Sequence, residues 1–290
     1  MKARFSWLAA LALALTIVPA AQAQSDRDRD RSRRSDDRDD GDWLARCRRD
    51  DSNDRDRVKF CEERTMGWRQ AGGQSLTVDA SPNGGVSVTG WDKDSVAVRV
   101  KVQTWGDDDQ EAREMAQSIR ITNQNGVLTT EGPRGYGRHG GWSVSFEIMA
   151  PRRVDLDLET MNGPLEVEDV TGRLRLQAQN GPLALMKVGG DVRAHAQNGP
   201  LHVELTGTRW DGEGLDAETQ NGPLTLLVPD GYNAQLETGT VNGPMDIGFP
   251  ITVQGRIGMG SRRRITTTLG SGGPTVRAVT TNGPAVLRRS

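Results

Sequence analysis

Apolar and polar residues alternate along much of the chain from Leu76 onwards. The alternation covers 76–80, 86–88 and 96–102, and it returns at 127–130 and 142–149. Successive side chains of a β-strand point to opposite faces, so alternation bounded by Gly, Asn and Asp predicts strands with one buried face. We therefore expect a β-rich portion at 70–150.

One stretch of this portion follows a helical pattern instead. Residues 107–120 begin with three aspartates and end with arginine, and apolar residues recur at the spacing of one helix face, at Ala112, Met115, Ala116 and Ile119. Acids at the start and a base at the end suit the helix dipole. The pattern predicts one helix, at about 107–120.

The tripeptide Asn-Gly-Pro repeats through the C-terminal half. Its Asn-Gly pairs are Asn162 and Gly163, Asn180 and Gly181, Asn198 and Gly199, Asn221 and Gly222, Asn242 and Gly243, and Asn282 and Gly283. The intervals are 18, 18, 23, 21 and 40 residues, and we interpret Gly272-Gly273-Pro274 in the longest as a degenerate copy. A second glycine turn lies between copies, so one period comprises two short strands and two turns.

Two arrangements fit this period. An Asn-Gly pair is typical of an antiparallel hairpin, which would give a meander or sandwich. In a solenoid, residues one period apart are direct neighbours and need the same turn, and stacked Asn side chains can hydrogen-bond along the axis. Asn and Gly tolerate positive φ, and Pro suits the first residue of a strand. The recurrence favours an all-β chain with a right-handed parallel β-helix, or β-solenoid, over 151–290.

The alternation also assigns faces to the repeat strands. With the aliphatic residues of 174–178 and 192–196 pointing inward, the side chains that point outward are Arg173, Arg175, Gln177, Arg193, His195 and Gln197. His202 flanks an inward valine, so both histidines of the repeats are expected to face solvent.

The N-terminus predicts export. Residues 1–23 combine a basic start, an apolar core and the small residues Ala21 and Ala23, which is typical of a signal peptide cut after Ala23. Its removal changes the net charge from −2 to −4, because Lys2 and Arg4 are its only charged residues. We expect a periplasmic or secreted protein, with no later segment apolar enough to span a membrane.

Residues 24–69 differ from the rest in composition. Their 14 acidic and 14 basic residues leave little apolar surface to bury, which predicts a charged low-complexity linker. Cys47 and Cys61, the two cysteines of the chain, are expected to form a disulfide in an oxidising compartment.

The net charge, the histidines and the acidic residues narrow the classes of function that the chain can have. A slightly acidic chain lacks the basic footprint of a nucleic-acid binder. His139, His195 and His202 match no metal-binding spacing, and no carboxylate pair stands out for glycoside chemistry. We therefore expect no cofactor, no metal site and no catalytic residues.

Several segments resemble a known family. They are 82–91 (PNGGVSVTGW), 239–243 (GTVNG), 253–258 (VQGRIG), the cysteine pair within its Arg/Asp-rich stretch, and the Asn-Gly turns. Together they resemble the bacterial exported β-strand-repeat family known as "putative adhesins", a domain family of unknown function. Pro follows Asn-Gly here where many relatives would carry a second Gly. The resemblance implies a β-solenoid and an envelope location, and it brings no catalytic residues.

The sequence therefore predicts an exported, non-enzymatic binding or structural module, whose partner is an envelope polysaccharide or another envelope protein. Two alternatives stay open. One is a polysaccharide-active enzyme on the same scaffold, and the other is an accessory sensor in envelope stress signalling.

Overall fold

The computed structural model describes residues 43–49, 57–70, 74–133, 140–250 and 263–290. The chain divides into two units, Met1–Asp50 and Asp51–Ser290, and each is considered by itself. Helix α2 (Trp43–Arg49) belongs to the first unit and was not expected from the sequence. The predicted signal peptide at 1–23 lies outside the described residues, and within them no helix has the length and apolarity needed to cross a membrane.

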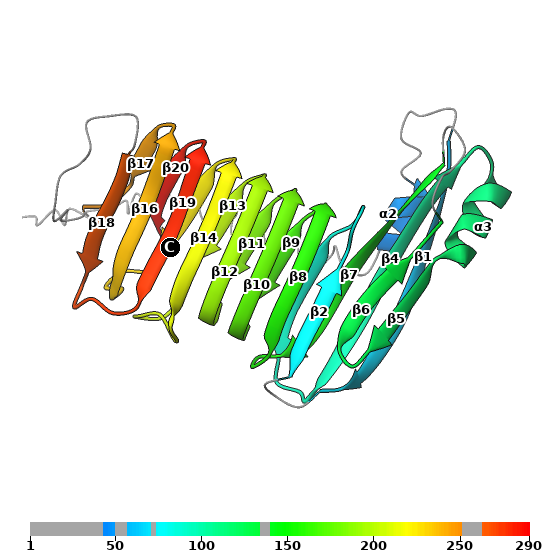
Figure 1. Cartoon of the computed structure of the whole chain (residues 1–290), viewed down its shortest axis with the longest axis horizontal. Coiled ribbons are helices and arrows are strands. Elements are labelled where there is room, and N and C mark those ends of the chain that lie inside the picture. Colours follow the sequence, from blue (N-terminus) through cyan, green and yellow to red (C-terminus); the bar gives the residue numbers. More distant parts are fainter. Residues whose placement is uncertain (1–42, 50–56, 71–73, 134–139, 251–262) are drawn as a thin grey trace, which may run out of the picture. The chain divides into compact units, whose positions relative to one another are not determined.

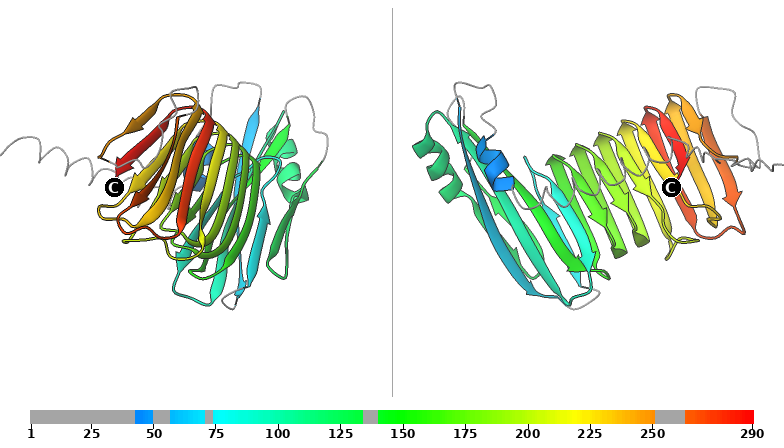
Figure 2. Two further views of the ribbon diagram at one scale, coloured as in Figure 1. Left: turned by 60° about the vertical axis from the view of Figure 1, so that its left-hand side comes forward. Right: turned by 180° about the vertical axis from the view of Figure 1, so that it is seen from behind.

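The second unit consists mainly of two ten-stranded sheets, here named A and B (Figures 1 and 2). In spatial order sheet A contains β1 (Val58–Arg69), β4 (Ser95–Gly106), β7 (Gly141–Pro151), β3 (Val86–Trp91), β9 (Leu165–Glu168), β11 (Leu183–Met186), β13 (Leu201–Glu204), β15 (Leu224–Val228), β20 (Ala285–Arg289) and β17 (Met245–Ile247). Sheet B contains β18 (Arg263–Leu269), β16 (Ala234–Asn242), β19 (Thr275–Asn282), β14 (Gly214–Asn221), β12 (Gly189–Asn198), β10 (Thr171–Asn180), β8 (Asp155–Asn162), β2 (Ser75–Asp79), β6 (Val127–Glu131) and β5 (Arg120–Gln124). The all-β expectation is confirmed. Both sheets are mixed, because β1–β4–β7, β5–β6 and β16–β18 pair antiparallel.

Strand β1 begins inside the segment expected to be a linker. It pairs antiparallel with β4 along its whole length, from Val58 opposite Gly106 to Arg69 opposite Ser95. Arg64, one of its charged residues, donates from Nη1 and Nη2 to the backbone oxygens of Ile119 and Ala116, each at 2.7 Å. Charged residues at the edge of a sheet therefore form a strand here because β4 and a helix end supply their partners.

The expected helix is present as α3 (Asp109–Ser118). The carboxylate of Asp108 accepts from the backbone N–H of Glu111 at 2.8 Å, which caps the first turn. Ala112, Met115 and Ala116 form its buried face, and Ile119 follows directly after it as a buried residue. The helical stripe in the sequence thus identified the packed face.

The repeats form two parallel ladders. In sheet B, Leu156, Leu174, Val192 and Leu215 stand side by side on β8, β10, β12 and β14. In sheet A, β9, β11, β13 and β15 pair in the same way. Strands joined by an Asn-Gly-Pro turn lie in different sheets, so the hairpin interpretation is wrong, and the aliphatic residues between the sheets are buried.

The glycine of each Asn-Gly-Pro turn is required by close stacking. A Cβ at any of the six would lie 2.0–2.2 Å from the backbone oxygen of the turn stacked against it. The expected reason, tolerance of positive φ, is not the cause: the corner asparagines have no positive φ, and among the corner glycines only Gly283 does. Asn125 and Gly126, with φ of 53° and 84°, form the Asn-Gly turn between the antiparallel strands β5 and β6.

The asparagines of the same turns form one continuous hydrogen-bonded ladder. Each side-chain Nδ2 donates to the Oδ1 of the next Asn in the stack at 2.7–3.2 Å. The order is Asn242, Asn282, Asn221, Asn198, Asn180, Asn162 and Asn83. The predicted stacking of Asn side chains is confirmed, and it extends to Asn83, before the first repeat.

The stack does not follow the chain order at its C-terminal end. Strand β19 lies between β14 and β16 (Figure 1), and pairing places β20 between β15 and β17. The interpretation of Gly272-Gly273-Pro274 as a degenerate corner is wrong. These residues follow β18, which runs antiparallel to β16, and they lead directly into β19.

Candidate binding surface

The outer face of sheet B carries rows of polar side chains held in register. At one outward position, parallel pairing aligns Asp157, Arg175, Arg193, Asp216, Arg277 and Glu237 across six neighbouring strands. Two residues further along, it aligns Glu159, Gln177, His195 and Glu218. Neighbouring strands lie about 4.8 Å apart, so each side chain meets its in-register neighbours.

Charges of opposite sign alternate along the first row with one exception. From β8 to β16 the signs run minus, plus, plus, minus, plus, minus, and the like pair is Arg175 beside Arg193. Like charges directly opposite each other destabilise a sheet. The pair is therefore the one place in this row where the side chains do not compensate their neighbours.

The acids on the β14 side of this pair are already engaged by a base on the next strand. Arg277 binds the carboxylates of Asp216 and Glu218, the latter at 3.0 Å, and its Nε lies 3.6 Å from Glu237. Burial lowers the pKa of Arg277, but its hydrogen bonds to Glu218 and Asp216 together outweigh this effect and raise it. Arg277 thus joins β14, β19 and β16 by charge as well as by backbone pairing.

The arginine pair is left open to solvent. Within the described part of the chain, the Arg175 side chain has no hydrogen bond or ion pair, and the Nε of Arg193 lies 3.7 Å from Asp191 with 68% of the side chain exposed. A hollow of about 400 Å³ lies over both arginines and is also lined by Gln177, His195 and the acids of β14. Its walls offer guanidinium, amide, imidazole and carboxylate groups at once.

We call the exposed outward residues of β10 and β12 the central strip. It is arginine-rich at one end, where the half-buried Asp191 stands beside Arg173, and amide-rich at the other, and acids flank it on β8 and β14. The central strip consists of Arg173, Arg175, Gln177, Gln179, Arg193, His195 and Gln197.

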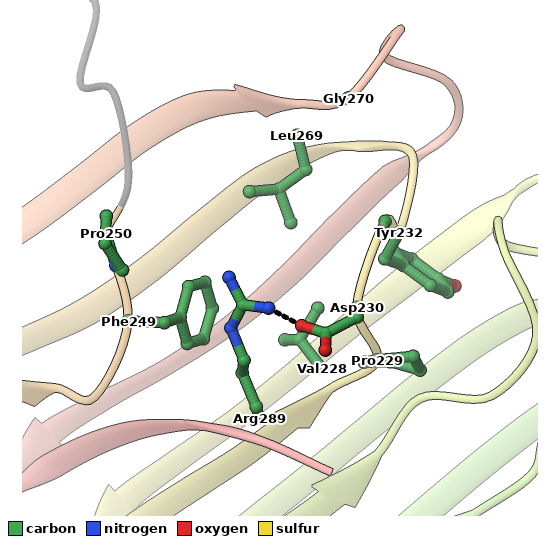
Figure 3. Close-up of a pocket in the computed structure, with 10 residues that line it drawn as sticks. Val228, Pro229, Asp230, Tyr232, Phe249, Pro250, Leu269, Gly270 and Arg289 are labelled. Atoms are coloured by element: carbon green, nitrogen blue, oxygen red, sulfur yellow. Dashed lines mark ion pairs between the residues drawn. The ribbon is translucent and has the colours of Figure 1, made fainter.

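A second hollow, of about 140 Å³, lies at the C-terminal end of unit 2 (Figure 3). The guanidinium of Arg289 lies between Asp230 and Phe249, forms an ion pair with the first and stands 5.2 Å from the ring centre of the second. Burial raises the pKa of Tyr232, which also lines the hollow, to about 12. The charged groups here satisfy each other, so this hollow is the weaker candidate for a ligand.

The structure assigns the residues singled out in the sequence as follows. Cys47 and Cys61 are disulfide-bonded, as expected. The corner asparagines and glycines stack into one column, whereas His195 and His202 point outward from different sheets. His139 lies outside the described residues, and no group of three potential metal ligands occurs within them. The network around Arg277 was missed, because nothing in the sequence indicates that β19 pairs with β14.

Comparisons with known proteins give remote likenesses only. No family model matches the sequence, and no curated protein does either. A "putative cell adhesion protein" from Clostridium sporogenes is 10% identical, with a TM-score of 0.40 over 80% of this chain and 100% of that chain. A "putative adhesin" from Bacteroides fragilis is 13% identical, with a TM-score of 0.28 over 79% and 97%. A "putative lipid binding protein" from Parabacteroides distasonis is 8% identical, with a TM-score of 0.28 over 79% and 97%.

Proposed function

We propose that this chain is an exported, non-enzymatic β-solenoid that serves as a binding module of the cell envelope, with the outer face of sheet B as its binding surface. The observation that carries this proposal is the central strip, where two neighbouring arginines lie under an open hollow. Arg175 has no ion pair in the described part of the chain, and Arg193 has only Asp191, at 3.7 Å, with 68% of its own side chain exposed. Parallel register keeps these side chains at fixed spacing, which is what a repeating polymer requires of a surface. An envelope polysaccharide is the partner of this kind, with another envelope protein as the alternative.

The right-handed parallel β-helix is part of the proposal. Its parallel stacking is supported by the two parallel ladders, by the alternation of successive strands between sheets A and B, and by the single column of Asn-Gly-Pro corners. Export is supported by the signal pattern of residues 1–23 and by the disulfide, which forms and persists in oxidising compartments.

The proposal that the protein is not an enzyme rests on the ion pairs made by the acids of β14 and β16 on this face. Arg277 forms ion pairs with Asp216, Glu218 and Glu237, so these three side chains are engaged in joining strands. A glycosidase instead needs one carboxyl group with a raised pKa opposite a second carboxylate. The acids of β14 and β16 thus favour a stabilising role over acid–base catalysis.

Co-sedimentation of purified residues 24–290 with insoluble envelope polymers tests this function. The mature chain should pellet with peptidoglycan sacculi or with another cell-wall polysaccharide, and soluble sugar fragments should not appear with time. A reporter enzyme fused after residue 30 should be exported in an oxidised, active form. Failure of the wild-type chain to pellet with any envelope polymer would overturn the binding role, and steady release of fragments would favour the enzyme.

A further inference from the structure

We infer that the central strip binds the carboxylate groups of an acidic glycan whose chain runs parallel to β10 and β12. This inference rests on the proposed binding function and names its ligand class. The guanidinium groups of Arg175 and Arg193 are the anchors, because planar N–H donors match the two oxygens of a carboxylate. Both stand on the same row of adjacent strands, so one carboxylate can contact the two together.

The flanking acids set the direction of the ligand. Asp157 and Glu159 are exposed on β8, and Asp216 and Glu218 stand on β14, on the two sides of the central strip. An anionic chain that crossed the strands would meet these carboxylates. Along the strands it follows β10 and β12, over about 20 Å between the first and last outward positions of the strip, at about 3.3 Å per residue. The acid of these two strands is Asp191, and at the edge of the hollow the ligand borders Asp216 and Glu218, which Arg277 already binds.

The far end of the central strip identifies the rest of the ligand. Gln177, Gln179 and Gln197 present exposed amides that can donate to and accept from sugar hydroxyl groups. The strip carries no Phe, Tyr or Trp for base stacking, and its width of two strands suits a ligand whose charges are widely spaced. Double-stranded nucleic acid carries one charge per about 1.7 Å of its axis and would overlap the acids on both sides. An uncharged glycan would leave the arginine pair uncompensated.

The test compares polygalacturonate with its methyl ester, which keeps the sugar chain and removes the charge. We expect residues 24–290 to bind polygalacturonate at low salt, at least 10-fold more weakly after methyl esterification, and more weakly as salt rises. The double variant R175Q/R193Q should lose at least 10-fold in affinity. The matched control R120Q/R209Q removes the same charge from exposed positions elsewhere in unit 2 and should bind as the wild type does.

The outcomes separate the two proposals. An equal loss of affinity for polygalacturonate in both double variants would show a nonspecific charge effect and overturn the inference. Tight binding of inorganic polyphosphate, with an affinity that is the same in R175Q/R193Q as in the wild type, would also overturn it. Wild-type binding to an envelope polymer that R175Q/R193Q does not weaken would overturn the inference while the binding function stands. Circular dichroism and melting temperature, unchanged in both variants, ensure that a loss of affinity reports the surface itself.

Discussion

Asn282 donates a hydrogen bond from its side-chain Nδ2 to the Oδ1 of Asn221 at 2.7 Å, although 61 residues separate them in the chain. Asn242, which comes between them in sequence, donates to Asn282 at 2.9 Å and so lies beyond it in the stack. The last repeat of the chain is therefore an interior layer. It pairs on both sides, with β14 and β16 in sheet B and with β15 and β17 in sheet A.

Deletion of residues 275–290 is expected to disrupt the fold far more than loss of a terminal repeat would. The deletion removes β19 and β20, and so it leaves Asp216 and Glu218 without Arg277. It also removes the strands with which β16 and β17 pair. We expect a melting temperature at least 10 °C lower, or an insoluble product. Deletion of Ser290 alone is the control. A shortened chain that melts like the full-length protein would show that β16 stacks directly on β14.

Replacement of Gly199 by alanine is expected to destabilise the protein by more than about 2 kcal/mol. Its Cβ would lie 2.0 Å from the backbone oxygen of Gly181, where no flexible side chain can move aside. Gly207→Ala is the comparison: nothing lies within 4 Å of its Cβ, and only its φ of 72° is unfavourable. Urea unfolding of both variants measures the difference, and equal costs would contradict the stacking explanation.

Replacement of Asn198 tests the side-chain ladder. Asn198→Ala removes one donated and one accepted hydrogen bond, for an expected cost of about 1–2 kcal/mol. Asn198→Asp keeps the acceptor for Asn221 but turns a carboxylate toward the Oδ1 of Asn180. The loss of stability in Asn198→Asp should be largest at pH 7. It should become smaller below about pH 4, where a protonated carboxyl group can again donate a hydrogen bond to Asn180. Gln220→Ala, an exposed neighbour, serves as the control in thermal unfolding at both pH values.

Much of this fold can be predicted from the sequence because its signals are local. The 18-residue spacing of Asn162, Asn180 and Asn198 indicates parallel stacking, and alternation assigns Arg175 and His195 to the outside. The position of β19 depends on which pairing of distant strands gives the lowest free energy, here one between residues 61 apart in the chain. The periodicity of the sequence does not indicate which pairing that is. Strand β1 is hidden for a similar reason, since Arg64 is satisfied only by a helix end far along the chain.

The charged residues on the outer face of sheet B show the same limit of prediction from sequence for the candidate site. The sequence places Arg175 and Arg193 on the surface, but whether each is compensated depends on its neighbours in space. Asp216 is next to Arg193 in register, and yet it is bound by Arg277 from the last repeat. The order of the layers therefore decides whether Asp216 compensates Arg193, and that order is absent from the sequence pattern.

Tyr232 provides a pH-dependent prediction. Burial disfavours the phenolate and raises the pKa of Tyr232 to about 12, against about 10 in the unfolded chain. The unfolded state therefore loses this proton first, so the stabilising contribution is complete below pH 10 and declines between pH 10 and 12. Absorbance at alkaline pH should show a late-titrating tyrosine that Tyr232→Phe removes. A single step near pH 10 in the folded wild type would contradict the buried position.

The central claim, that the outer face of sheet B holds the ligand, is tested most directly by histidine footprinting. His195 belongs to the central strip, whereas His202 points outward from sheet A and is an internal control. Acylation with diethylpyrocarbonate can be followed at each residue by mass spectrometry, with and without saturating polygalacturonate. We predict that the polymer slows acylation of His195 several-fold and leaves His202 unchanged. Bound polymer that leaves His195 as reactive as before, or that protects only His202, would contradict the account.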